Sequence, residues 1–346
     1  MQTLPLAVLR TGLVTPVGLS APASCAAFRA KLTNPTPTHF ADAAGEWIMA
    51  HQVPLPQPLR GLPKLARMAA MAIAEALQDI AAHEWNGLPL LLCVAQAQRP
   101  GRPAGLDDEL FLRIQSELGV VFGDASAVVP QGRIGVALAL AKARELVAQG
   151  RVNGRTRRVL VAAVDSLLSW PMLEHCERAG RLLTPANSNG FMPGEAAGAL
   201  LLGEPDGGPA LVCTGIGFGR ESATIESEAP LRADGLVQAI RAALAQAGRQ
   251  MHEMDFRITD DAGEQYYFKE GSLALSRLLR VRKEAFDIWH PAECTGEVGA
   301  ASGATILAAA LAACEKRYAI GPDILVHLGD DDGPRAALCL QYRGGA

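Results

Sequence analysis

The sequence predicts an α/β protein, and three observations support this fold class. Short apolar runs typical of buried strands alternate with helical segments in both halves of the chain. Each half also places a long alanine-rich helix after a turn of small residues, at Gly135–Ala148 and at Gly303–Cys314. The 346 residues are 49% hydrophobic and 20% charged, enough to form two cores. Such alternation implies βαβ units around mostly parallel sheets.

The first half, residues 1–205, is expected to alternate buried strands with helices. Continuous apolar runs predict strands covered on both faces, at Leu6–Leu9, Leu88–Val94, Arg158–Val164 and Ala199–Leu202. A Gly/Pro turn is expected at Thr11–Gly18. Segments rich in alanine, leucine and methionine predict helices at Ala21–Lys31, Leu65–Ala82, Leu106–Leu118 and Ile134–Gln149. The region Thr33–Leu62 has no period and many prolines, which predicts an irregular excursion.

The second half, residues 206–346, is expected to repeat this pattern after a linker at Glu204–Pro209. The expected strands are Ala210–Gly219, Phe256–Thr259, Ile324–Gly329 and Ala336–Tyr342. The expected helices are Asp234–Ala247, Leu273–Leu279 and Ala300–Lys316. The acidic run Asp330–Gly333 is interpreted as a solvated turn between the last two strands.

Charge and composition exclude several classes of partner. The net charge is -4, and the only cluster of basic residues is Arg155–Arg158, so nucleic acid is not expected to bind. The first residues are interrupted by Arg10 too early for a secretory signal, and no run of about 18 apolar residues predicts a membrane span. Seven scattered cysteines indicate reduced thiols in a cytoplasmic protein. The histidines show no metal-ligand spacing, so neither metal nor cofactor is expected.

Five segments, in order along the chain, resemble motifs of the β-ketoacyl synthases of the thiolase superfamily. They are Thr11–Gly18 (TGLVTPVG), Ile134–Gly150, Val161–Leu168 (VAAVDSLL), Gly190–Gly198 (GFMPGEAAG) and Glu297–Gly303 (EVGAASG). The resemblance covers nearly the full chain. It implies a five-layer αβαβα fold of two related halves, dimeric through its N-terminal half with a second copy or with another protein.

The catalytic positions of that family are altered here. The resemblance puts Gln131 at the nucleophilic cysteine, and a glutamine cannot form an acyl-enzyme. The two catalytic histidines, which donate hydrogen bonds to a thioester oxygen, correspond to Asp261 and Glu297. Ionised carboxylates only accept hydrogen bonds and would repel a developing enolate. These carboxylates are therefore interpreted either as a new acid–base pair or as salt-bridged groups in a closed pocket, with Arg133 as the natural partner.

These alterations indicate a protein without condensing activity that acts by binding. An alternative is an acyltransferase or decarboxylase that uses Gln131, Asp261 and Glu297 on thioesters of coenzyme A or acyl carrier protein. A third reading is a non-catalytic partner of an active ketosynthase, as chain length factors are.

Two features suggest where a partner would bind. Tyr266, Tyr267 and Phe268 form an aromatic cluster after the turn that approaches the altered site, where they could contact a partner or plug the acyl tunnel. Trp47 lies in the proline-rich excursion. The stretches AKLTNPT and GEWIMAHQVPL resemble ketosynthase-like proteins of type VI secretion effector clusters. That resemblance implies a co-chaperone whose partner is a secretion effector or adaptor protein.

Overall fold

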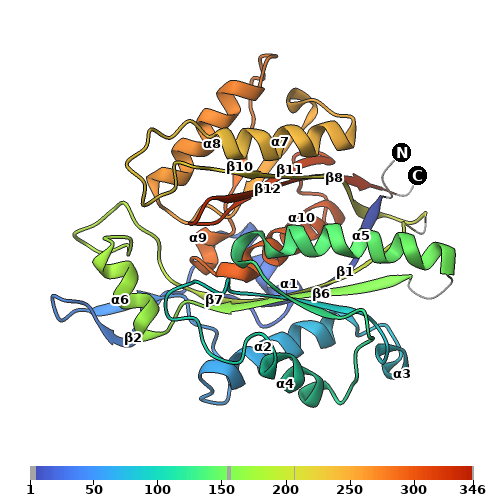
Figure 1. Cartoon of the computed structure of the whole chain (residues 1–346), viewed down its shortest axis with the longest axis horizontal. Helices are drawn as coiled ribbons and strands as arrows, with labels where there is room; N and C mark the ends of the chain where they lie inside the picture. The colour runs from blue at the N-terminus through green and yellow to red at the C-terminus, as the bar shows by residue number, and fades with distance from the viewer. Residues whose placement is uncertain (1–4, 154–156, 206, 345–346) are drawn as a thin grey trace.

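The computed structural model describes residues 5–153, 157–205 and 207–344, and it has the five-layer α/β architecture that the sequence predicts (Figure 1). Figure 1 shows two sheets, a helical layer between them and a helical layer outside each. Ten strands form one continuous hydrogen-bonded array, in which the two sheets are joined where β1 pairs with β8 through Leu6, Ala7 and Val8.

The two sheets have the same topology. The first has the order β5-β4-β6-β7-β1 and the second the order β10-β9-β11-β12-β8, and each is parallel in its outer part and antiparallel near the junction. The strands of the first are β1 (Leu6–Val14), β4 (Leu90–Val94), β5 (Ala127–Pro130), β6 (Arg158–Ser166) and β7 (Glu195–Gly203). Those of the second are β8 (Ala210–Arg220), β9 (Phe256–Thr259), β10 (Ile288–Trp289), β11 (Asp323–Gly329) and β12 (Pro334–Arg343).

The central layer consists of α5 (Gly135–Asn153) and α10 (Ser302–Glu315), each preceded by a short 3-10 turn, η1 (Gly132–Ile134) and η3 (Gly299–Ala301). The largest cluster of buried side chains surrounds these two helices and reaches both sheets. Twelve of the fourteen residues of α10 are buried. This explains why α10 is apolar all round rather than amphipathic.

The outer layers consist of amphipathic helices. Helices α2 (Gly61–Ala76) and α4 (Glu109–Leu118) cover the first sheet, and α7 (Asp234–Ala247) and α8 (Gln265–Leu278) cover the second. Helix α7 packs directly on the backbone of β8: a Cβ added at Gly217 would lie 2.0 Å from the carbonyl oxygen of Ala239. The glycines of β8 therefore permit a close approach that any side chain would block.

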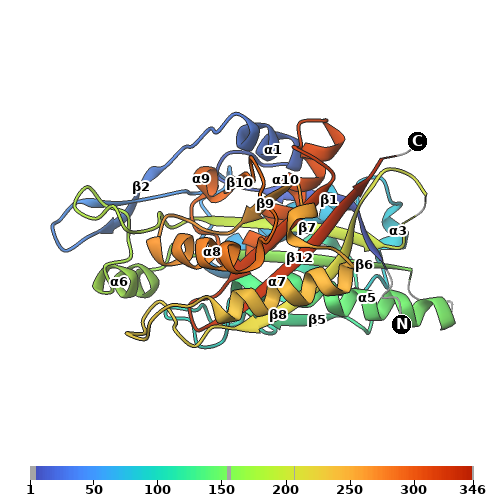
Figure 2. The same cartoon turned by 90° about the horizontal axis from the view of Figure 1, so that it is seen from above.

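The remaining elements lie at the edges of this frame. They are α1 (Ala21–Arg29), β2 (Thr36–Ala41), β3 (Trp47–Ala50), α3 (Ala82–Trp85), α6 (Trp170–Arg178), η2 (Met251–Glu253) and α9 (Ala292–Thr295). Strands β2 and β3 form a separate hairpin that extends from one end of the molecule (Figure 2). Among the described residues, no helix is both long and apolar enough to cross a membrane.

Several predicted boundaries were wrong for local reasons. The strand predicted at Leu6–Leu9 continues to Val14, because Gly12 packs against the backbone of Ala72 instead of forming a turn. The region Thr33–Leu62, predicted to be irregular, contains the β2–β3 hairpin and the start of α2. The helix predicted to end at Ala82 ends at Ala76, and α6 was not foreseen. Within the expected linker, Asp206 lies outside the described residues, and the division at residue 205 remains a prediction.

The contact between the two central helices is tested by a pair of glycine substitutions. A Cβ at Gly303, in α10, would lie 2.7 Å from the Cβ of Val136, whereas at Gly135, in α5, the nearest atom would be the Cβ of Cys93 at 3.4 Å. We expect Gly303→Ala to lower the free energy of unfolding by about 1–3 kcal/mol because it overpacks this contact. Gly135→Ala should raise it by ~0.5 kcal/mol through helix propensity. Urea unfolding of both variants measures the difference, and equal effects would contradict the packing argument.

Candidate functional site

The candidate site lies where the carboxyl ends of parallel strands from both sheets meet the starts of α5 and α10. Strand β5 leads to Gln131 and Arg133, β9 leads to Asp260, and β11 leads to the acidic turn at Asp330. Open α/β sheets usually bind ligands at this edge, because loops from several strands converge there. The topology therefore places chemistry-bearing side chains from both halves around a single point.

The two central helices begin with the same backbone conformation. Gln131 and Val298 have φ, ψ of −126°, 24° and −116°, 18°. Each is followed by a glycine with a positive φ, +51° at Gly132 and +54° at Gly299. This left-handed conformation favours glycine, and it turns the chain sharply into the helix. The repeated geometry is local evidence that the two halves are built alike.

A buried carboxylate lies at each of these helix starts. Asp330 Oδ2 accepts the backbone N–H of Arg133 at 3.0 Å, and Asp165 Oδ2 accepts that of Ala300 at 2.9 Å. A Cβ at Gly132 would lie only 2.2 Å from Asp330 Oδ2, so glycine is also needed for space. Helix N-termini expose unpaired N–H groups and attract negative charge, which explains both contacts.

The side chain of Arg133 forms the centre of the site. Its guanidinium donates to Glu297 Oε2 at 2.9 Å and to Asp331 Oδ1 at 3.2 Å, and its Nε lies 3.7 Å from Asp260 Oδ2. The guanidinium carbon also lies 4.5 Å from the centre of the Tyr267 ring. Arg133 is buried, so its charge depends on these neighbours instead of on water.

A second arginine extends the cluster. Arg181 contacts both carboxylate oxygens of Glu264, at 2.7 and 2.8 Å, and both oxygens of Asp331, at 2.8 and 3.1 Å. The hydroxyl of Tyr267 donates to the same Asp331. Asp331 thus joins the two guanidiniums, and bidentate pairs of this kind hold side chains in fixed orientations.

The charges of the cluster do not balance if every group is ionised. The five carboxylates of Asp260, Glu264, Glu297, Asp330 and Asp331 surround the guanidiniums of Arg133 and Arg181, and a third arginine beside them, Arg99, is paired with a sixth carboxylate, Asp165, at 2.8 Å. A buried excess of negative charge is costly, so some carboxylates take up protons near neutral pH. Burial raises the pKa of Glu297 and of Asp260 to about 7, against the lowering influence of Arg133. Burial also raises the pKa of Asp330.

Asp331 behaves in the opposite way. Burial works to raise its pKa, but the guanidiniums of Arg133 and Arg181 outweigh burial and hold the pKa of Asp331 well below its usual range. Asp331 is therefore held in its ionised form, whereas burial favours the protonated forms of Glu297, Asp260 and Asp330. Protonation of these groups lowers the negative charge around Arg133.

The structure separates the three residues that the sequence placed at the catalytic positions. Glu297 lies in the cluster with Arg133 as its partner, one of the two arrangements considered for it. Gln131 is exposed at the start of η1. Asp261 accepts a hydrogen bond from Thr259 Oγ1 at 3.0 Å, and burial raises its pKa to about 6. The neighbouring Asp260 is the one whose carboxylate lies 3.7 Å from Arg133 Nε, and the match of Asp261 to a catalytic histidine remains a prediction.

The aromatic residues proposed as a partner surface differ in their exposure to solvent. Tyr267 is buried, with 4% of its surface exposed, because it stacks on Arg133 inside the site, so its assignment to a surface was wrong. Tyr266 is half-buried, and its hydroxyl donates to the Ala223 carbonyl oxygen. Phe268 and Trp47 are exposed, at 39% and 60%.

The sequence reasoning did not single out Asp330, Asp331, Arg181 or Glu264 as members of the cluster. Asp330 and Asp331 were interpreted as part of a solvated turn, which was wrong because both carboxylates contact Arg133. Arg181 gave no signal, since a lone arginine in a loop has no pattern. A usable signal for the two aspartates was their place directly after the buried strand β11.

Little space remains within the cluster. The cavity bordered by Arg99, Arg133, Phe191, Glu297 and Asp331 has a volume of about 30 Å³, room for one or two water molecules. Among the described residues, no group of three His, Cys, Asp or Glu side chains is arranged to hold a metal ion.

The protein has a thiolase-like fold, of the type found in ketosynthases. The chain is similar to "AntDE:AntF (apo): type II PKS acyl-carrier protein in complex with its ketosynthase bound to the hexaketide", with a TM-score of 0.80, 15% identity and coverage of 99% of this chain and 100% of that one. It is also similar to "The ishigamide ketosynthase/chain length factor" (TM-score 0.76, 17% identity, coverage 99% and 100%). A third is "Ketosynthase (ApeO) in Complex with its Chain Length Factor (ApeC) from Xenorhabdus doucetiae" (TM-score 0.77, 13% identity, coverage 99% and 99%). No family model and no curated protein matches the chain.

The raised pKa of Glu297 predicts that the stability of the protein changes with pH through this residue. The pKa of Glu297 is about 7 in the folded chain, against an ordinary value of 4.5. The stability that its proton contributes is therefore fully present below pH 4.5 and is lost as the pH rises through 7. Relative to Glu297→Gln, the wild type should lose on the order of 2 kcal/mol of unfolding free energy between pH 5 and pH 8. Urea unfolding across this range measures it.

The matched control is Glu117→Gln, which removes a carboxylate paired with Arg67 at the surface. Its pH profile should follow that of the wild type, because an exposed pair contributes little. If the free energy of unfolding changed with pH in the same way for the wild type and Glu297→Gln, this would contradict a raised pKa of Glu297.

Proposed function

We propose that this protein is a non-catalytic, ketosynthase-like binding protein. The observation that carries the proposal is the position of Arg133, whose guanidinium lies between Glu297 and Asp331 at the start of the central helix. By the sequence resemblance, Glu297 stands where a ketosynthase has a histidine that donates to the thioester oxygen. The Glu297 carboxyl is held by Arg133, and the Arg133 guanidinium already donates to Glu297 and Asp331, so both groups are engaged with each other instead of facing a thioester oxygen.

The thiols of the chain support the same reading. All seven cysteines are buried, and burial raises the pKa of each above its ordinary value. A thiol held in its neutral form is a poor nucleophile, because the thiolate is the reactive species. Gln131 has no nucleophilic atom. A covalent acyl intermediate therefore has no cysteine thiolate as acceptor among the described residues.

We further propose that the protein associates with a second protein through its N-terminal half. Strand β5 is the outer strand of the first sheet, and its residues are exposed or half-buried, so one edge is free to pair with another chain. Trp47 on the β2–β3 hairpin adds an exposed aromatic side chain. The sequence resemblance supports an effector or adaptor protein of a type VI secretion cluster as the partner, for which this chain would act as a co-chaperone.

A second candidate is the non-catalytic partner of an active ketosynthase. The observation that favours it is that two of the similar structures are ketosynthases paired with chain length factors. In that case the partner would be a ketosynthase instead of a secretion effector. Both candidates share the closed site and differ only in the protein that binds.

The closed site predicts that thioesters do not react with the protein. After incubation with malonyl- and acetyl-coenzyme A, or with acyl carrier protein carrying an acyl group, intact mass spectrometry should show an unmodified chain. Release of carbon dioxide from malonyl-coenzyme A should stay at the buffer rate. An adduct on the chain, or decarboxylation that Glu297→Gln abolishes, would instead favour an acyl-thioester enzyme.

The binding role predicts a specific partner in the native cytoplasm. A tagged chain should recover a secretion effector or its adaptor, and Trp47→Ser should reduce the yield at least fivefold if the hairpin contributes to the surface. Leu112→Ser, which changes a side chain of similar exposure on α4, 63% against 60%, should leave the yield unchanged. Recovery of a ketosynthase would select the second candidate, and recovery of acyl carrier protein alone would overturn the binding role.

A further inference from the structure

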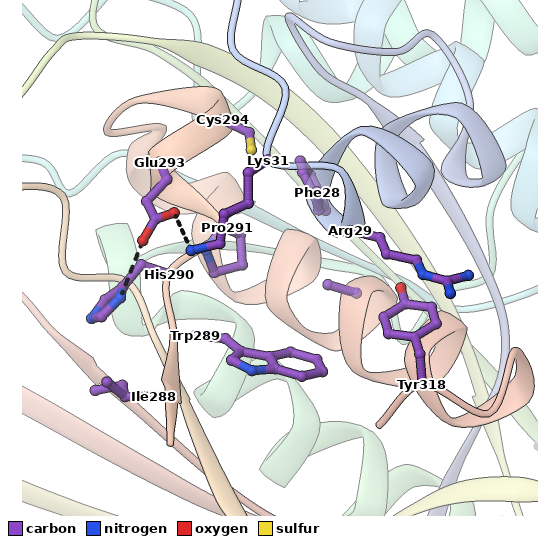
Figure 3. Close-up of a pocket in the computed structure, with 11 residues that line it drawn as sticks. Phe28, Arg29, Lys31, Ile288, Trp289, His290, Pro291, Glu293, Cys294 and Tyr318 are labelled. Carbon is purple, nitrogen blue, oxygen red and sulfur yellow. Dashed lines mark ion pairs between the residues drawn. The ribbon is translucent and has the colours of Figure 1, made fainter. Parts of the chain in front are cut away.

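A second cavity lies outside the Arg133 cluster and shares no lining residue with the cavity there. It has a volume of about 250 Å³ and opens between the end of α1, the strand β10 with the turn after it, and Tyr318 beyond α10 (Figure 3). This volume is slightly below the usual range for drug-sized ligands, so it suits a smaller molecule. Nothing in the proposed binding role uses this pocket.

The walls of the pocket are mainly aromatic. Phe28 comes from α1, Trp289 from β10 and Tyr318 from the segment after α10. The Trp289 ring stacks on the Tyr318 ring, with centroids 6.2 Å apart and an angle of 21° between the planes. It also contacts the Phe256 ring, with centroids 4.5 Å apart. Trp289 is therefore held in place by contacts with two other aromatic rings. A rigid aromatic wall suits a flat apolar ligand, because no side chain has to be ordered on binding.

Two of the buried lining residues have small, unreactive side chains. Ala309 of α10 and Cys294 of α9 are both buried, at 6% and 3% exposed. Burial raises the pKa of the Cys294 thiol to about 11, so the sulfur acts as an apolar surface. The pocket thus has an apolar interior without a group that would attack a ligand.

The rim of the pocket carries an excess of positive charge. Figure 3 shows Arg29 and Tyr318 at one end and the ion-paired Lys31, Glu293 and His290 at the other. Lys31 Nζ lies 3.3 Å from Glu293, and the Arg29 guanidinium lies 4.7 Å from the centre of the Tyr318 ring. Among the residues that the structure describes, no carboxylate pairs with Arg29. One guanidinium at the rim is therefore available for an anion.

Lys31, a cationic residue of this rim, has an unfavourable left-handed backbone conformation. Helix α1 ends in a motif in which Leu32 N–H bonds to the Ala27 carbonyl and Lys31 N–H to the Phe28 carbonyl. Lys31 is the residue in the left-handed conformation, with φ of +52°. Glycine is preferred at that position, because it has no Cβ penalty. A lysine here costs stability that a glycine would not, and its side chain borders the pocket.

We infer that this pocket binds a small aromatic carboxylate, with the ring against Trp289 and the carboxylate on Arg29. The interior is apolar and aromatic, the volume fits about ten non-hydrogen atoms, and the rim has one unpaired guanidinium. An uncharged ligand of the same shape would gain the stacking but lose the charge-assisted hydrogen bonds.

The test uses the purified full-length chain with 3-phenylpropanoate and its uncharged amide in isothermal titration calorimetry. We expect one site per chain, with the amide binding about tenfold more weakly, since a charge-assisted hydrogen bond is roughly that strong. Arg29→Gln should weaken the carboxylate about tenfold and leave the amide unchanged. Arg113→Gln, an exposed arginine on α4, is the matched control and should change neither.

The variant Lys31→Gly distinguishes a loss of ligand binding from a loss of folding. This change removes the left-handed lysine, so it should raise the melting temperature and at the same time weaken binding of 3-phenylpropanoate. A variant that merely unfolds would lower both. The inference is overturned if the carboxylate does not bind, if carboxylate and amide bind equally, or if Arg29→Gln binds the carboxylate as well as the wild type does. Because no partner protein is present, these outcomes are independent of the proposed binding role.

Discussion

The structure around the site depends on one buried ion pair, between Arg133 at the start of the central helix and Glu297 before the second one. Arg133 comes from the first half of the chain, and its acceptors Glu297, Asp331 and Asp260 all come from the second. A desolvated guanidinium has a large cost unless its donors are paired, so the two halves must meet with these carboxylates in place. The ion pair therefore links the two halves of the chain at the site.

The scaffold explains why this location accepts such a cluster. The starts of α5 and α10 point their free N–H groups toward the carboxyl ends of the strands, and each binds a carboxylate, Asp330 and Asp165. The same electrostatic feature favours an anionic nucleophile in an enzyme built on this fold. Here structural carboxylates occupy it, and arginines compensate their charge. A shared fold therefore carries no catalytic function by itself, because chemistry depends on the residues at this edge.

Prediction from the sequence worked best where a pattern was both strong and local. The strand Phe256–Thr259 and the helix Asp234–Ala247 were predicted with the bounds that the structure has, since apolar runs and amphipathic spacing depend on near neighbours. The β2–β3 hairpin was missed because its register contains an irregularity and its prolines suppress the strand signal. Asp260 and Asp261 are adjacent after strand β9, and only the folded structure shows that Asp260 is the one beside Arg133, because adjacent residues point in different directions.

The sequence by itself determined the fold class, because that follows from residue types repeated along the whole chain. That Gln131 and Glu297 stand where ketosynthases have their nucleophile and a histidine remains a prediction from the resemblance. Only the tertiary structure decided what these residues do. Arg181 and Asp331 lie 150 positions apart and yet share two hydrogen bonds, which no local pattern encodes. The protonation of the cluster likewise depends on how many carboxylates are buried around two guanidiniums. Burial and long-range pairing are properties of the folded chain, so they appear only when both halves are in place.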